Sequence, residues 1–264
     1  MAVGKVLSLS DRIRGHMRTK DRAAVSAMII KNALLLMAAF LFGRAGGIFG
    51  CYPLGIAFLG AVGNGIGVAY AGLLVSALFS KGYAASLAAT YTAGLMLRCA
   101  TSLMMARGGR RKTLDDGKKA IDPAGVIVGM ISLNASAQVP LVRCAVSALL
   151  AFSFGMFRLI SGGFLYYDLF GLLTGTLLCP ALTLGLSMLF TDDEKYLAKR
   201  SVGIITLGLM LIFSLRGYEI LGFSPANIAA LGVALWAASR GGVEGALRGC
   251  AAGLAAGIVA GGEG

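Results

Sequence analysis

Between two apolar runs, residues 43–61 read GRAGGIFGCYPLGIAFLGA. The segment carries one charged residue, Arg44, one proline, Pro53, and six glycines. An arginine just inside the end of an apolar run lays its stem along the lipid and extends its guanidinium to headgroups or water. Proline suits the first position of a helix, where its missing N–H would have no partner. The segment therefore predicts a helix end, a tight external turn and the start of a new helix.

The composition indicates the class of protein. Of the 264 residues, 57% are hydrophobic and 14% are charged, whereas a soluble domain carries about 25% charged residues. The mean hydropathy is +0.81. This much apolar side chain needs lipid around it. We therefore predict an all-α, polytopic transmembrane helical bundle of about eight to nine hydrophobic segments in contact with membrane lipid, with a cytoplasmic N-terminus.

Hydropathy divides the chain into a basic cytoplasmic arm, residues 1–27, and a multi-span membrane domain, residues 28–264. The predicted spans are 28–48, 83–105, 142–160, 166–190, 201–215, 221–239 and 249–262. Residues 54–80 form a short broken hairpin with turn residues at 63–67, and two short spans or one re-entrant hairpin both fit. Residues 124–140 contain Asn134, Ser136 and Gln138 and are interfacial, re-entrant or half of a broken helix.

Basic residues predict the orientation. With the N-terminus inside, eighteen Lys and Arg residues fall on the cytoplasmic side and four on the outer side. The basic cytoplasmic loop at 107–122 holds six of them. The positive-inside rule favours this topology over the inverted one. The basic residues of the cytoplasmic segments account for the net charge of +12. A basic protein can also bind nucleic acid, but we find no nucleic-acid-binding motif in the sequence.

Three charged residues fall within or beside predicted spans. Arg98 lies about 10 Å from the inner end of its span, and Arg143 sits at a span start. We interpret both as membrane anchors, with a buried ion pair as the alternative. Asp168 suggests a proton or ion group, but its predicted position near the outer edge weakens that interpretation.

The sequence predicts no catalytic residue, no cofactor and no metal ligand. The five cysteines form no CxxC pair, and His16 is the only histidine, which argues against a disulfide framework or a zinc site. Gly117-Lys118 is followed by Lys119 rather than Ser or Thr, so it is not a phosphate-binding loop. The acidic run at 192–194 is interpreted as a solvated turn.

A row of glycines marks the predicted helix 241–261. They recur every fourth residue: Gly241, Gly245, Gly249, Gly253, Gly257 and Gly261. On an α-helix such a row drifts by only about 40° per step and forms one stripe. Without Cβ atoms the stripe lets another backbone approach closely. We predict antiparallel packing against the span 221–239 or, as a second choice, contact with another copy of the chain in a homo-oligomer.

The segments GRA and PLGIAF resemble the start of the membrane region of the stage II sporulation protein E family, from endospore-forming bacteria. The motif residues in this chain are Gly43, Arg44, Ala45, Pro53, Leu54 and Gly55. The order and spacing of the spans, and the pair Tyr167-Asp168 that opens one of them, are also similar.

This resemblance implies a domain that anchors a serine phosphatase in the bacterial cytoplasmic membrane and places it at the asymmetric division septum. It also implies association with the tubulin-like division ring. The family's metal-dependent phosphatase domain has no counterpart in these 264 residues, so we expect no enzymatic activity from this chain. The alternative function is a small multi-span transporter or permease, which requires broken helices and intramembrane polar groups.

Overall fold

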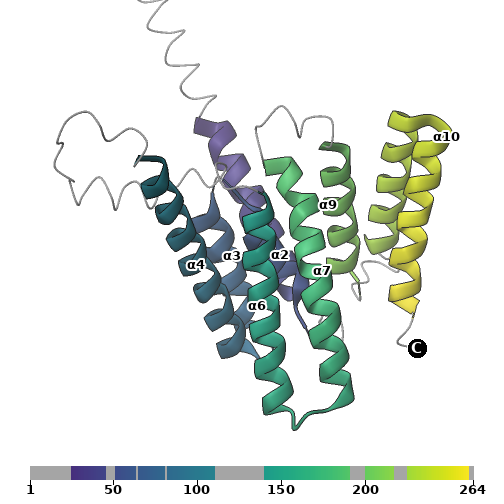
Figure 1. The fold of residues 1–264 in the computed structure, drawn as a ribbon. Coiled ribbons are helices and arrows are strands. Elements are labelled where there is room, and N and C mark those ends of the chain that lie inside the picture. Colours follow the sequence, from purple (N-terminus) through teal and green to yellow (C-terminus); the bar gives the residue numbers. More distant parts are fainter. Residues whose placement is uncertain are drawn as a thin grey trace, which may run out of the picture.

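The computed structural model describes residues 25–45, 51–63, 65–80, 82–110, 140–190, 200–216 and 225–261. Over these residues the fold is all-helical, as predicted (Figure 1). The described part of the chain begins with the helix Val25–Arg44. It is followed by α2 (Pro53–Ala61), α3 (Ile66–Leu78), α4 (Ala84–Arg110), α6 (Pro140–Ser161), α7 (Tyr166–Phe190), α9 (Arg200–Ser214) and α10 (Pro225–Gly261).

Local sequence sets several of these boundaries. Pro53 occupies the start of α2, where a missing N–H is harmless. Gly65 precedes α3 with a φ of +89°, in the left-handed region that glycine adopts without steric cost. Gly242, with a φ of +55°, divides α10 into two arms. The turn predicted at 63–67 and the break within α10 therefore both depend on glycine.

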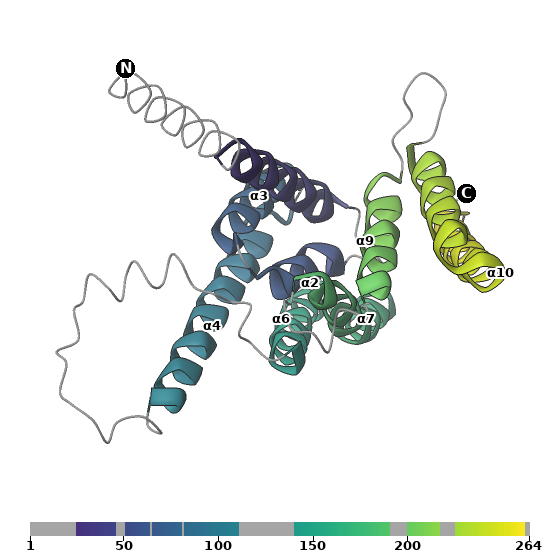
Figure 2. The same cartoon turned by 90° about the horizontal axis from the view of Figure 1, so that it is seen from above.

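The short helix α2 lies at the centre of the bundle. Its nine residues are all buried, and it contacts α3, α4, α6 and α7. Figure 2 shows α2 enclosed by its neighbours, whereas α10 lies at the far edge, beyond α9. A nine-residue helix is about 14 Å long, less than half of the ~30 Å hydrocarbon core of a bilayer. The predicted hairpin 54–80 is thus two short helices, of which α2 is wholly inside the protein.

Three of the described helices are long and apolar enough to cross a membrane: Val25–Arg44, Pro140–Ser161 and Tyr166–Phe190. This is fewer than the eight to nine hydrophobic segments that hydropathy predicted. The helices α3 and α9 have 13 and 15 residues, or about 20 and 22 Å. The helix α4 has 27 residues but carries Arg98 and a basic end, which lowers its mean hydropathy.

Some of the predicted segments lie outside the described residues. These are residues 1–24 of the basic arm, most of the loop 107–122, the polar segment up to residue 139, and the charged turn 192–199. The first helix spans 25–44 rather than 28–48, so it includes the last residues assigned to the arm. Pro180 lies within the continuous helix α7.

Candidate functional site

The C-terminal end of α2 is held by two arginines from neighbouring helices. The last carbonyls of an α-helix have no partner within the helix. Arg98 Nη1, from α4, donates to the carbonyl oxygens of Leu59 at 2.7 Å and Val62 at 2.5 Å. Arg143 Nη1, from α6, donates to the carbonyl oxygen of Ala61 at 3.0 Å. Since the C-terminal end of a helix dipole is negative, the two guanidinium charges also stabilise this end electrostatically.

The burial of these arginines corrects the interpretation made from the sequence. Arg98 is 2% exposed and Arg143 is fully buried, so neither is a membrane anchor that reaches the lipid surface. Both guanidinium groups instead donate to backbone carbonyls of α2 and its C-cap. The arginines are buried because α2 ends inside the bundle. Its last carbonyl oxygens therefore lie closer to these side chains than any lipid headgroup.

Small and polar side chains of α7 line the flank of α2. Cys179 Sγ lies 3.6 Å from the carbonyl oxygen of Pro53. Thr183 Oγ1 donates to the carbonyl oxygen of Cys179 at 2.8 Å and lies 3.4 Å from that of Ala57. A Cβ at Gly60 would lie 3.1 Å from Thr183 and 3.1 Å from Ser147 of α6. The three helices therefore pack at close range around the centre of α2.

The N-terminal end of α2 differs from the C-terminal end. Tyr52 is the N-cap residue, and no side chain caps the helix there. Tyr91 of α4 is fully buried, and its hydroxyl has no hydrogen-bond partner among the described residues. That hydroxyl lies against Gly55, where a Cβ would collide with it. The start of α2 thus has no side-chain cap, and the Tyr91 hydroxyl beside it has no partner among the described residues.

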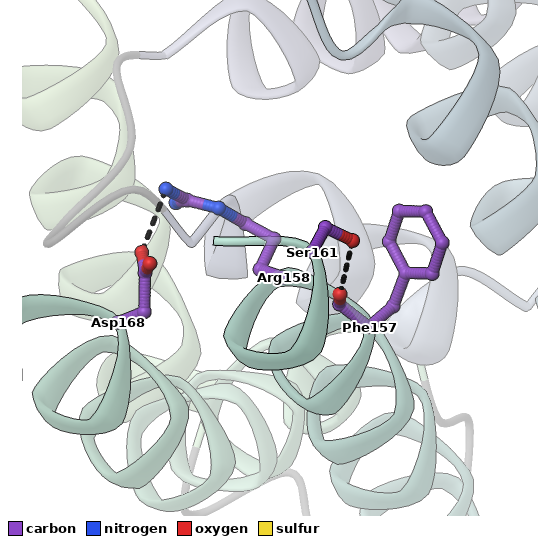
Figure 3. A network of polar contacts seen from close by, with 4 residues as sticks. All are labelled: Phe157, Arg158, Ser161 and Asp168. Atoms are coloured by element: carbon purple, nitrogen blue, oxygen red, sulfur yellow. Dashed lines mark hydrogen bonds and ion pairs between the residues drawn. The ribbon is translucent and has the colours of Figure 1, made fainter. Parts of the chain in front are cut away.

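A polar cluster lies beside the turn between α6 and α7, near the start of α2. Arg158 Nη2 and Asp168 Oδ1 form an ion pair at 2.8 Å, with the two side chains 12% and 5% exposed (Figure 3). The Arg158 guanidinium also lies 4.9 Å from the ring centroid of Tyr83. The ring of Tyr52 is 6.4 Å from that of Tyr83 and 6.3 Å from that of Phe154. Asp168 is therefore the partner of Arg158 rather than an isolated proton or ion group.

Figure 3 also shows how the α6 helix ends at this cluster. Ser161 Oγ donates to the carbonyl oxygen of Phe157 at 2.5 Å, and Arg158 points across to Asp168 on the next helix. The turn that follows contains Gly163 and Phe164, both with positive φ. Positive φ is uncommon for a phenylalanine, so the ion pair spans a tightly constrained connection.

An apolar groove of about 510 Å³ runs between α7 and α9 and reaches Leu54 of α2. Its remaining lining residues are Thr174, Leu177, Leu178, Ala181, Leu182, Leu209, Met210 and Phe213. Ligand pockets in proteins are about 300–1,000 Å³ and usually carry a few directed polar groups. This groove offers almost no directed polar groups, so it resembles a groove that faces lipid.

The motif residues fall on both sides of the connection between the first helix and α2. Gly43 lies against Ser76 of α3, and Ala45 is buried. Arg44 is exposed, and its guanidinium is 5.9 Å from the ring centroid of Phe79. Pro53, Leu54 and Gly55 form the buried first turn of α2.

Two glycines of the predicted stripe lie against the preceding arm of α10. A Cβ at Gly245 would collide with the carbonyl oxygen of Ala237. A Cβ at Gly249 would lie 3.0 Å from Ala234 Cα and 3.0 Å from Ala237 Cβ. The surroundings of Gly241, Gly253 and Gly257 lie outside what the structure describes. At Gly245 and Gly249, the two arms of α10 are thus in backbone contact.

Sequence reasoning did not single out Tyr91, Cys179 or Thr183. Each is an ordinary residue within an apolar run, and only its position beside α2 gives it a role. The arginines did carry a signal. Burying an ionisable side chain in an apolar segment costs free energy, so such a side chain generally has a partner. Within the described residues, no three His, Cys, Asp or Glu side chains gather to form a metal site.

No protein-family model, curated protein or solved structure matches the chain. The resemblance to the stage II sporulation protein E family therefore depends on the motif residues and on the spacing of the spans.

Proposed function

We propose that this chain is a multi-pass domain of the bacterial cytoplasmic membrane. The observation that carries this proposal is the wide exposure of apolar side chains around a core that holds charged residues. Arg98, Arg143 and Asp168 are buried, and many large apolar residues are exposed. The exposed set includes Met28, Ile29, Leu34, Leu173, Leu177, Ile228, Leu231 and Leu235. Soluble monomers rarely expose apolar patches of this extent.

The arrangement of helix ends supports the same proposal. The end of α4, the start of α6, the end of α7 and the start of α9 lie at one end of the bundle in Figure 1, and the turn between α6 and α7 lies at the other. The first group borders the segments that the charge bias assigns to the cytoplasm. Successive crossings in alternating directions would place those basic segments on one side, as the positive-inside rule requires.

Within that class, we propose the role that the family resemblance implies. The domain anchors a serine phosphatase and places it at the asymmetric division septum, with the tubulin-like division ring as its partner and self-association as a second interaction. What supports this is the position of the motif: Pro53, Leu54 and Gly55 start the central helix, Gly43 lies against Ser76 of α3, and Ala45 is buried. Five of the six motif residues thus lie inside the fold, and Arg44 is exposed.

Localisation tests this role directly. The full chain, fused at its N-terminus to a fluorescent protein, would be expressed in a sporulating endospore-forming bacterium. We expect fluorescence to concentrate at the asymmetric septum. A control fusion carrying an unrelated multi-span protein should label the whole membrane evenly. Even labelling by this chain as well would contradict the anchoring role while leaving membrane insertion intact.

One observation favours the transporter as a second candidate. The helix α2 is a half-length helix with both ends inside the protein, and transporters commonly build their binding sites from such interrupted helices. Reconstituted vesicles loaded with chloride would be assayed for electrogenic anion release. Sustained release above that of protein-free vesicles favours a transporter, and release equal to theirs favours the anchor.

A further inference from the structure

We propose that the N-terminal end of α2 is a binding site for a small monovalent anion. The site consists of the first turn of α2, Pro53 to Gly55, together with the hydroxyl of Tyr91. It lies inside the bundle and is separate from the arginine-held C-terminal end of the same helix.

The first argument is the imbalance between the two ends of α2. Both ends are buried, since all nine residues of the helix are buried. At the C-terminal end, two guanidinium groups satisfy the carbonyls of Leu59, Ala61 and Val62. At the N-terminal end there is no side-chain cap. Since Pro53 has no N–H, the donors of this turn are the backbone N–H groups of Leu54 and Gly55. The N–H groups of a first helical turn point outward along the axis, and this end of the helix carries a partial positive charge. Such an end is a ready site for an anion.

The second, independent argument is Tyr91. Its side chain is fully buried, and its hydroxyl has no partner among the described residues. A buried hydroxyl without a hydrogen bond is costly, and phenylalanine would fill the same volume without that cost. The hydroxyl lies against Gly55, where any side chain would displace it. Gly55 and Tyr91 therefore leave an O–H donor at the first turn of α2.

The third argument is the sign of the charge inside the bundle. Among the residues whose burial is described, the fully or largely buried ionised side chains are Arg98, Arg143, Arg158 and Asp168. The single carboxylate is already paired with Arg158. Arg158 Nη1 is buried without a hydrogen-bond partner, and Arg158 stacks on Tyr83, whose ring neighbours that of Tyr52. The unsatisfied groups are thus donors and the excess charge is positive, so the ligand must supply acceptors and negative charge.

The enclosure of the site restricts the ligand to a small, weakly hydrated anion, because the protein must replace the water around it. Chloride and nitrate are suitable probes, and gluconate is a monovalent anion too large for the site.

The experiment measures the melting temperature of the purified full chain in detergent. Sodium chloride or sodium nitrate would be titrated against sodium gluconate at constant ionic strength. We expect each tenfold rise of the small anion above its Kd to raise the Tm by about 3–5 °C. The variant Tyr91→Phe should bind the anion about 10- to 100-fold more weakly. It should be at least as stable as the wild type in gluconate.

The matched control is Tyr70→Phe. The Tyr70 hydroxyl is 2.9 Å from Thr92 Oγ1, so its loss should lower the Tm in every salt and leave the anion dependence unchanged. The proposal is overturned if the wild-type Tm is the same in chloride, nitrate and gluconate. It is equally overturned if Tyr91→Phe retains the full anion dependence, since the site then lies elsewhere. Neither result bears on septal localisation, so the two proposals fail separately.

Discussion

Arg98 Nη1 lies 2.7 Å from the carbonyl oxygen of Leu59, a residue 39 positions earlier in the chain. This contact joins α4 to the end of α2, and Arg143 makes the corresponding contact from α6. A charged side chain in the middle of an apolar run is therefore a structural link in this protein. It holds a half-length helix at the centre of the bundle.

Replacing Arg98 with methionine should destabilise the protein. The substitution keeps an unbranched stem but leaves the carbonyls of Leu59 and Val62 buried without that donor, at about 1–3 kcal/mol for each. Unfolding of the detergent-solubilised protein, followed by heating or by SDS titration, measures the loss. Arg200→Met is the control, because Arg200 is exposed at the start of α9. Equal stability of the two variants would show that Arg98 does not hold α2.

The ion pair between Arg158 and Asp168 should couple α6 to α7. Both side chains are largely buried, and removing one partner of a buried pair typically costs about 3–5 kcal/mol, because the other charge remains unpaired. A double-mutant cycle with Arg158→Met and Asp168→Asn tests this. The double variant should be more stable than the sum of the single losses implies, by about 0.5–3 kcal/mol. Strict additivity would mean that the two side chains do not interact in solution.

The glycine contact between the two arms of α10 should tolerate no side chain. Gly249→Ile places a branched side chain where a Cβ alone would already lie 3.0 Å from Ala234 and Ala237. We expect a clear drop in melting temperature. Gly232→Ile, in the first arm of the same helix, is the matched control, because a Cβ there would meet nothing within 4 Å. If both variants melt like the wild type, the stripe packs against lipid only.

The loop 107–122 should face the cytoplasm. Single cysteines would be introduced at Gly109 and Ser161 in a cysteine-free background and probed in intact cells with an impermeant thiol reagent. Ser161 is preferable to Gly162, because a side chain at Gly162 would collide with Asp168, whereas Ser161 is exposed. We expect labelling at Ser161 and protection at Gly109. The opposite pattern would invert the topology.

The purified chain should have no phosphatase activity. The expectation comes from the sequence, in which the twelve Asp and Glu residues are scattered rather than clustered as in a metal-dependent active site. Hydrolysis of a phosphoserine peptide would be measured with Mg²⁺ or Mn²⁺ present. Metal-dependent hydrolysis that disappears in an Asp192→Asn, Asp193→Asn variant would refute this. Both aspartates lie outside the described residues.

Local patterns in the sequence were enough to predict the helical class and several helix positions. The predicted span 166–190 coincides with α7, and 142–160 lies within α6. Hydropathy and turn residues act over a few neighbouring positions, so they can be read from one segment at a time. The period of four in the glycine row is local in the same sense, and two of its members, Gly245 and Gly249, lie against the preceding arm of α10.

The tertiary structure decided the roles of the charged residues. A hydropathy profile cannot tell whether an arginine in an apolar run extends to lipid headgroups or binds a carbonyl inside the bundle, since the answer depends on which acceptor is nearer. For Arg98 and Arg143 the nearer acceptors are the carbonyls that α2 exposes by ending inside the protein. Likewise, Asp168 is paired because α6 and α7 bring it to Arg158. The sequence by itself determined which segments are apolar helices, and the packing around α2 determined what their polar side chains do, because burying a charge or a carbonyl is tolerable only where a partner lies within hydrogen-bond distance.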